Sequence, residues 1–187
     1  GAHFASCGHS RKRRHDEVVV AHLPTLEAAG LNARAEVQMQ HAQRKIDIFY
    51  TDPQPESAAT QRVMADVTIQ HAYAPMSTQL PNTRLILSRA SKEKTRKYTN
   101  DAAAWRASIQ PLPYTTFGAV SKDARQWIER IEQAAIAGAH YFPGLERRFQ
   151  VVWRENISFA ILRATAVAAT RGMQRHRAMV AMLPEDN

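Results

Sequence analysis

The sequence predicts a mixed α/β domain, in which a small sheet is flanked by helices and followed by a helical C-terminal cap. The chain has 187 residues, of which 44% are hydrophobic and 22% charged, proportions typical of one folded domain with a buried core. Short runs of β-branched and aromatic residues alternate with stretches of helical spacing along most of the chain. Beyond about residue 143 only helical spacing remains.

A helix and four strands are predicted from these patterns. Apolar side chains at helical spacing predict a first helix over Asp16–Ala29, with His15 or Asp16 as its cap. Pro24 predicts a kink or an early end of that helix. Alternating or β-branched runs predict strands over 32–40, 45–51, 63–69 and 109–117. The first of these strands is expected to be half-buried, and the two prolines of the last place it at an edge of the sheet.

The other stretches predict loops and helices. Prolines favour a long loop over 70–87, before a Lys- and Arg-dense helix from Ser88 to about Trp105. A helix capped by Ser121 is expected to end at Gly138. Apolar spacing predicts two further helices, over about 145–156 and 158–178.

The charge balance points to an anionic partner. Lys and Arg number 25 against 17 Asp and Glu, a net charge of +8 and a pI near 10.1, which favours nucleic acid first and an acidic membrane surface second. A single cysteine excludes a disulfide framework, and no apolar run has the length that spans a bilayer. The first residues do not resemble a signal peptide. Because the chain begins Gly-Ala without Met, we expect an excised piece of a larger protein with a cloning scar.

Two aspartates lie inside apolar strands, with hydrophobic residues on both sides of Asp47 and of Asp66. A carboxylate in such a place costs desolvation energy unless it is paired or binds a cation. On adjacent strands the two could hold Mg²⁺ or Mn²⁺. The alternative is a pair of edge-strand aspartates bridged to nearby Lys and Arg, and the pattern alone slightly favours this alternative.

Lys94, Lys97 and Tyr98 share one face of the Lys-rich helix because residues three and four apart are neighbours. A lysine directed at metal-binding carboxylates could orient an attacking water or stabilise developing charge. Taken alone, the pattern favours a solvated helix or one that contacts phosphates. By the same reasoning Glu36 is a surface residue, and Arg14, His15 and Asp16 form a helix cap.

The order of these features resembles a known family. It is similar to that of the restriction-like endonuclease domain of site-specific non-LTR retrotransposon polyproteins. The motifs that carry the resemblance are, in order, Arg14-His15-Asp16, Glu36, Ile46-Asp47-Ile48, Ala65-Asp66-Val67-Thr68-Ile69 and Ala90-x-x-x-Lys94-x-x-Lys97-Tyr98. These polyproteins also carry a reverse transcriptase. Their endonuclease has the PD-(D/E)XK fold, close to archaeal Holliday-junction resolvases. The resemblance covers roughly residues 3–120 and rests on order and spacing, not on a single strong motif.

The resemblance implies a metal site. Asp47 matches the aspartate of the family's Pro-Asp, and Asp66 matches the second acidic ligand. Together they would hold one or two Mg²⁺ (or Mn²⁺), with the carbonyl of Val67 as a further ligand. Asp16 takes the place of the acidic residue on the first helix of the resolvases, with Glu17 as its substitute.

The resemblance also implies a catalytic lysine, which the parent fold places where Thr68 stands here. The retrotransposon branch moves this lysine to the next helix, so Lys94 or Lys97 is the candidate, with Tyr98 beside it. Ile46 replaces the family's proline, and the separation of 19 positions between Asp47 and Asp66 is longer than usual. Neither departure removes a ligand.

The implied activity is metal-dependent nicking of DNA in the nucleus, which exposes a 3′-hydroxyl that primes reverse transcription. Duplex DNA and the upstream reverse transcriptase domain would be the partners, while element RNA, dimerisation and the target sequence stay open. Phosphates would be bound, without reading of sequence, by Arg84 and Arg89 and above all by Arg11, Lys12, Arg13, Arg14, Lys92 and Arg96.

Two further expectations concern the domain boundaries and the alternative functions. Residues 1–10 would be a cloning scar or the remnant of an upstream Zn²⁺ knuckle, of which His3 and Cys7 form half, and residues 11–187 the endonuclease domain. The alternative functions are a basic nucleic-acid-binding module without chemistry, and a degenerate nuclease fold that serves as a docking domain of the same polyprotein.

Overall fold

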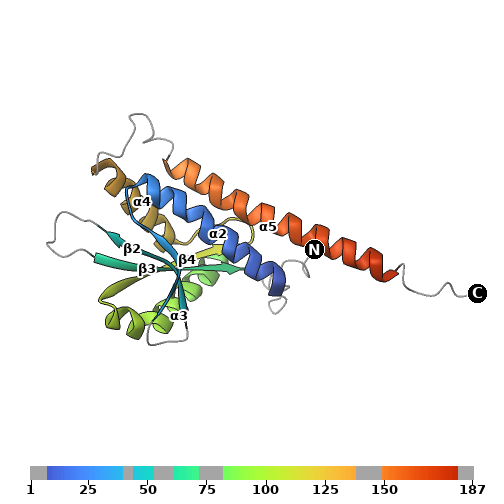
Figure 1. Ribbon diagram of the computed structural model, residues 1–187, viewed down its shortest axis with the longest axis horizontal. Helices are drawn as coiled ribbons and strands as arrows, with labels where there is room; N and C mark the ends of the chain where they lie inside the picture. The colour runs from blue at the N-terminus through green and yellow to red at the C-terminus, as the bar shows by residue number, and fades with distance from the viewer. Residues whose placement is uncertain (1–7, 40–43, 53–60, 72–81, 138–148, 181–187) are drawn as a thin grey trace, which may run out of the picture.

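A four-stranded mixed sheet forms the centre of the domain (Figure 1). The computed structural model describes residues 8–39, 44–52, 61–71, 82–137 and 149–180. The strands β1 (Arg34–Gln38), β2 (Lys45–Asp52), β3 (Gln61–Gln70) and β4 (Ala107–Thr115) lie in the order β1-β2-β3-β4. The first three are antiparallel, and β4 runs parallel to β3. A parallel pair needs a crossover, which helix α3 (Thr83–Ala104) supplies.

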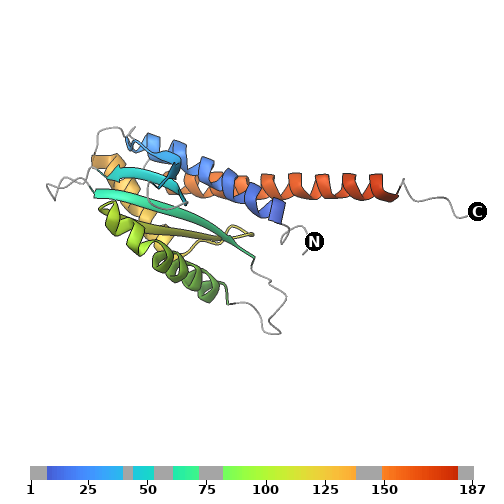
Figure 2. The ribbon, with the colours of Figure 1, turned by 60° about the horizontal axis from the view of Figure 1, so that its bottom comes forward.

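Helices cover both faces of the sheet (Figure 2). Helix α3 packs on one face, around Met64 and Tyr98. The other face carries the larger core, in which Trp127 and Trp153 are fully buried. This core is closed by α2 (Gly8–Ala28), α4 (Lys122–Ala137) and α5 (Phe149–Val180). The predicted mixed α/β architecture with flanking helices is therefore confirmed.

The strand predictions hold best where side chains alternate between two packed faces. β2, β3 and β4 match their predicted ranges within two residues, and β4 is an edge strand as its prolines indicated. The prediction of a half-buried first strand is wrong, because four of the five residues of β1 are exposed. β1 lies at the other edge of the sheet, and Glu36 interrupts its extended backbone with a φ of 49°.

The helix predictions are wrong at several ends. α2 begins at Gly8, so His15 and Asp16 lie inside it and neither is its cap. Pro24 does not end it, because Val18 and Leu26 are buried in the same core on both sides of the proline.

The remaining helices also differ from their predicted ends. α3 begins at Thr83, five residues before Ser88, with the Asn82 side chain accepting the N–H of Leu85 as its cap. The two predicted C-terminal helices are one helix, α5, whose buried face runs on without a break through Trp153, Ile157 and Ile161. The Ser121 cap is confirmed by its hydroxyl, which accepts the N–H of Ala124.

Some predictions fall on residues outside the described ranges, among them His3, Cys7 and Gly138. Across the part of the chain that the structure describes, no helix is long and apolar enough to span a bilayer.

Candidate active site

The candidate site lies where β2 and β3 stop pairing. Backbone pairing of the two strands extends to Ile48 and Ala65. The start of β2 stays bonded to β1, and the end of β3 stays bonded to β4. At this point the Asp47 carboxylate replaces the strand partner, and its Oδ2 accepts the N–H of Val67 at 2.7 Å. The sheet therefore opens between β2 and β3, and Asp47 and Asp66 stand next to the opening.

Asp66 is a buried carboxylate paired with a lysine. Its side chain is 2% exposed, and Lys94 Nζ lies 2.7 Å from its Oδ2. Burial, followed by repulsion from Asp47, raises the pKa of Asp66, while the charge of Lys94 and hydrogen bonds from Lys94 and Tyr98 act in the opposite direction. The structure thus brings together the two predicted aspartates and a lysine of the following helix.

The two candidate lysines have different environments. Lys94 reaches Asp66, whereas Lys97 Nζ donates to the Tyr98 hydroxyl at 2.9 Å and lies 4.6 Å from the centre of the Tyr98 ring. Burial and the neighbouring Asp66 raise the pKa of Tyr98, so its hydroxyl stays protonated at neutral pH. The two lysines therefore have different partners: Lys94 pairs with the Asp66 carboxylate, and Lys97 donates to the Tyr98 hydroxyl.

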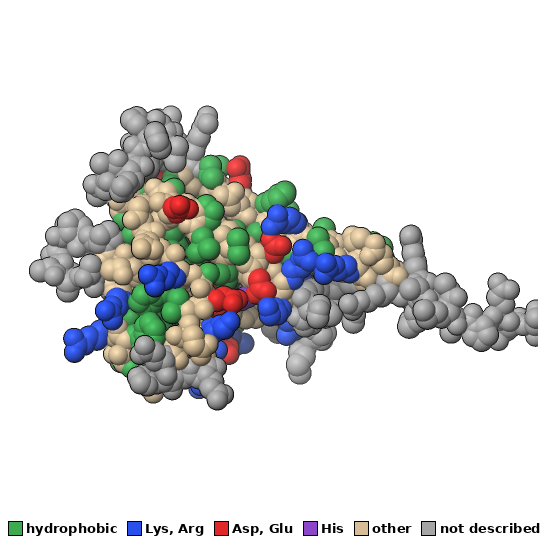
Figure 3. All heavy atoms as spheres, in the orientation of Figure 1, with side chains coloured by type: hydrophobic (Ala, Val, Ile, Leu, Met, Phe, Trp, Pro, Cys, Tyr) green, Lys and Arg blue, Asp and Glu red, His purple; other side chains and the backbone are tan. Residues whose placement is uncertain are grey.

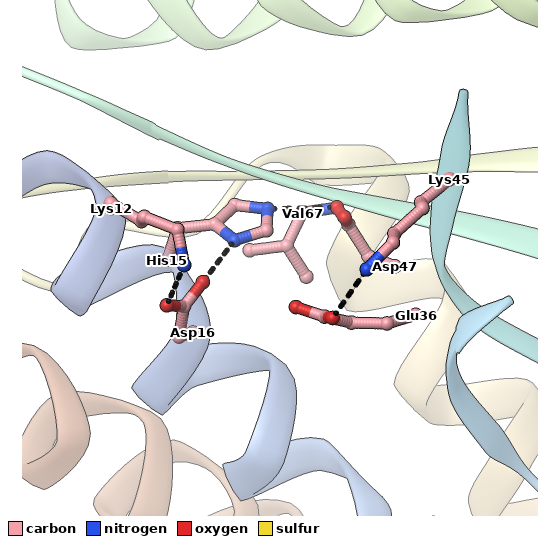
Figure 4. Close-up of polar contacts among 7 residues, drawn as sticks. All are labelled: Lys12, His15, Asp16, Glu36, Lys45, Asp47 and Val67. Carbon is pink, nitrogen blue, oxygen red and sulfur yellow. Dashed lines mark hydrogen bonds and ion pairs between the residues drawn. The ribbon is translucent and has the colours of Figure 1, made fainter. Parts of the chain in front are cut away.

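His15 of α2 is a site residue that the sequence reasoning missed. Its Nε2 lies 2.9 Å from Asp47 Oδ2, and its Nδ1 lies 3.3 Å from Asp16 Oδ1 (Figure 4). Burial alone would lower the pKa of His15, but the hydrogen bonds and negative charges of Asp47 and Asp16 raise it. Because both neighbours are carboxylates, both ring nitrogens donate when the ring is a cation. The sequence did not reveal this role because α2 begins earlier than predicted, at Gly8, so that His15 lies inside the helix and not at its cap.

Asp16 and Glu36 add negative charge on the open side of the site. Asp16 pairs with Lys12 at 3.0 Å, and Glu36 pairs with Lys45 at 3.2 Å. Figure 4 shows the Glu36 carboxylate pointing from β1 toward Asp16 and Asp47. Acidic side chains gather at the middle of this face of the molecule, with Lys and Arg around them (Figure 3).

Glu17, the predicted substitute for Asp16, belongs to a different contact. It is paired with Arg13 of its own helix and with Arg163 of α5. The pair with Arg163 joins α2 to α5, and Asp16 is left as the acidic residue of α2 next to the site.

The basic residues expected on DNA divide into three groups. Arg14 is 1% exposed, which sets it apart from the other predicted phosphate-binding residues, and its phosphate-binding role stays a prediction. It lies one helical turn before the buried Val18 and faces the core with it. Lys12 and Arg13 are engaged in ion pairs with Asp16 and Glu17, whereas Arg11, Lys92 and Arg96 are exposed.

The donor set fits a hard divalent cation. In the described ranges, no three His, Cys, Asp or Glu side chains converge as a metal cluster. Asp47 and Asp66 nevertheless supply the oxygen ligands that Mg²⁺ and Mn²⁺ prefer. Their mutual repulsion contributes to the raised pKa of Asp66, and a cation between them would relieve it. The N–H of Val67 is bonded to Asp47, and the predicted role of its carbonyl stays a prediction.

No family model matches the chain, and no curated protein sequence matches it.

Proposed function

We propose that the chain is a divalent-metal-dependent DNA endonuclease of PD-(D/E)XK type, related to the restriction-like endonuclease domain of non-LTR retrotransposons. The observation that carries this proposal is the buried Asp66, with Lys94 at 2.7 Å and Asp47 at the opening of the sheet. Buried carboxylates with raised pKa values concentrate at functional sites. A basic chain with net charge +8 suits a phosphodiester substrate.

Asp47 and Asp66 would hold the ion, and His15 and the Val67 N–H would fix the orientation of Asp47. The ion held there would supply Lewis-acid chemistry, which would lower the pKa of a water and polarise the scissile phosphate. The water oxygen adds to phosphorus, the bond to the 3′-oxygen breaks, and that oxygen takes up a proton. The products are a 3′-hydroxyl and a 5′-phosphate.

Lys94 supplies the ammonium that the parent fold takes from the position of Thr68. Its Nζ, held against Asp66, can orient the water or neutralise charge on the phosphate. In a retrotransposon polyprotein the new 3′-hydroxyl would serve the reverse transcriptase in the nucleus.

A nicking assay on supercoiled plasmid with Mg²⁺ or Mn²⁺ tests the proposal. We expect nicking by the wild type and none by Asp66→Asn, with Glu129→Gln, an exposed residue of α4, as the control variant. Lys94→Ala should lower the rate by roughly a hundredfold, within the range for one acid–base or charge-stabilising group, and Lys97→Ala by much less. Equal losses in both lysine variants would contradict the assignment of Lys94.

A second candidate is a non-catalytic nucleic-acid-binding or docking domain. The ion pair between Lys94 and Asp66 favours it, because this pair alone compensates the buried carboxylate without any metal. Metal-independent DNA binding without cleavage, unchanged in Asp66→Asn, would favour this candidate.

A further inference from the structure

A second basic surface lies on the other side of α3 from Asp66. A groove of about 610 Å³ runs between α3 and α4 across β4, and its lining includes Ser91, Thr95 and Gln110. A second hollow of about 510 Å³ adjoins it along the starts of α3 and α4. Both are lined by Ser88 and Asp123, so the two hollows are neighbours, and together they are called the groove.

The groove is strongly cationic. Six basic side chains from two helices line it: Arg84, Lys92, Arg96, Lys122, Arg125 and Arg130. Asp123 is the one acidic residue in this lining, and it accepts a hydrogen bond from Ser91 at 2.5 Å. Six positive charges around one engaged carboxylate create a potential that attracts a polyanion.

The groove has a fixed polar floor. Arg130 donates to the side-chain oxygen of Gln110 at 2.6 Å. Gln110, itself 7% exposed, donates to the carbonyls of Pro111 and Asp123. These bonds hold the Arg130 guanidinium over β4 before any ligand binds, which lowers the entropy cost of binding.

Helix α3 separates this groove from the candidate active site. Lys92 and Arg96 lie two positions before and after Lys94, and two positions correspond to about 200° around a helix. Lys94 contacts Asp66, so Lys92 and Arg96 point away from the carboxylates. Lys92 and Arg96, predicted to bind phosphates, therefore belong to the groove and not to the site.

We infer that the groove binds the phosphate backbone of a nucleic-acid duplex, apart from the strand held at Asp47 and Asp66. Apart from Asp123, the polar residues of its lining are Lys and Arg with Ser, Thr and Gln, the residue types that contact phosphates without reading bases. The rest of the lining is apolar and comprises Leu87, Ile109, Pro111, Ala119 and Val120. Aromatic side chains, on which single-stranded bases stack, are missing from this described lining. Duplex binding follows from these features whether or not the carboxylates cut DNA.

The test measures binding of the full chain to a short labelled duplex of arbitrary sequence by fluorescence anisotropy in EDTA. Lys92→Gln/Arg96→Gln should weaken binding about tenfold and reduce the slope of log K against log salt by about 2, because each phosphate contact contributes about 0.9. The control Arg154→Gln/Arg171→Gln removes the same charge from exposed positions of α5 and should change binding less than about twofold. Circular dichroism checks that each variant is folded.

Each other outcome overturns the inference. Equal weakening by the groove and control variants would mean that only net charge matters. Unchanged binding of the groove variant, or tighter binding of a single strand of the same sequence, would exclude the duplex groove. Asp66→Asn should bind like the wild type in EDTA, so a failed nicking assay with an intact groove effect would count against the proposed endonuclease alone.

Discussion

Two histidines of α2 show how neighbours shift the pKa of one residue type in opposite directions. His15 and His22 are seven positions apart, so they project from nearly the same side of the helix. His15 lies between Asp47 and Asp16, which raise its pKa against the effect of burial. His22 is fully buried without a carboxylate beside it, and burial lowers its pKa to about 3. The same helix thus carries a histidine with a raised pKa into the site and a histidine with a lowered pKa into the core.

His22 is satisfied by hydrogen bonds from the core. The Trp153 indole N–H donates to its Nδ1 at 3.3 Å, so the neutral ring carries its proton on Nε2 and donates it to the Tyr114 hydroxyl at 2.9 Å. These bonds join α2, α5 and β4. The comparison teaches that an apolar enclosure lowers the pKa of a histidine and keeps it as a structural group, whereas carboxylates at both ring nitrogens raise the pKa.

Removing the His22 ring should give the largest change. His22→Leu leaves the Trp153 N–H and the Tyr114 hydroxyl buried without their hydrogen-bond partner. It also replaces a ring that packs against Trp127 with a side chain of different shape. We expect a loss of about 2–4 kcal/mol of unfolding free energy. Urea denaturation measures it, and His15→Leu serves as the matched change on the same helix. A loss below that of His15→Leu would contradict the structural role of His22.

Stability should respond to pH through the two histidines with opposite signs. The depressed pKa of His22 means that the unfolded chain takes up a proton below pH 6.5 and the folded chain only near 3. Stability therefore falls as the pH drops, by up to about 1.4 kcal/mol for each unit across this window. His15, with its raised pKa, contributes stability that is present below its unfolded pKa and lost as the pH rises through its folded pKa.

Urea denaturation at a series of pH values in EDTA separates the two contributions. His22→Asn should flatten the acid side of the profile of unfolding free energy against pH. His15→Gln should flatten the part of the profile above the pKa that His15 has in the unfolded chain. The same flattening in both variants would mean that neither histidine is the source.

His15→Gln should affect stability least. The side chain is 30% exposed, and the amide can keep one hydrogen bond to Asp47, so we expect a loss below about 1 kcal/mol. Nicking should fall roughly tenfold, because Asp47 loses the imidazole that orients it. The pH profile of nicking, compared between His15→Gln and the wild type, distinguishes this positioning role from a general loss of fold.

Periodic patterns predicted the strands that build the site. β2 and β3 alternate between two packed faces, and an aspartate inside each was recognisable as an unusual carboxylate. The face of α3 that carries Lys94 also followed from helical spacing. The first turns of α2 contain Arg11 to Arg14 and no apolar side chain, so hydrophobic periodicity could not reveal the helix start. Without the helix start, the sequence could not show that His15 lies inside α2.

By itself the sequence determined the class of fold, the basic character of the chain, and the two strand aspartates with a lysine-bearing helix after them. These follow from local periodicity and residue chemistry. Only the tertiary structure decided which lysine meets Asp66, that Arg14 is buried, and that Lys92 and Arg96 line a groove beyond α3. The reason is that spacing places a side chain on a helix face, whereas the packing of helices on the sheet decides what that face meets.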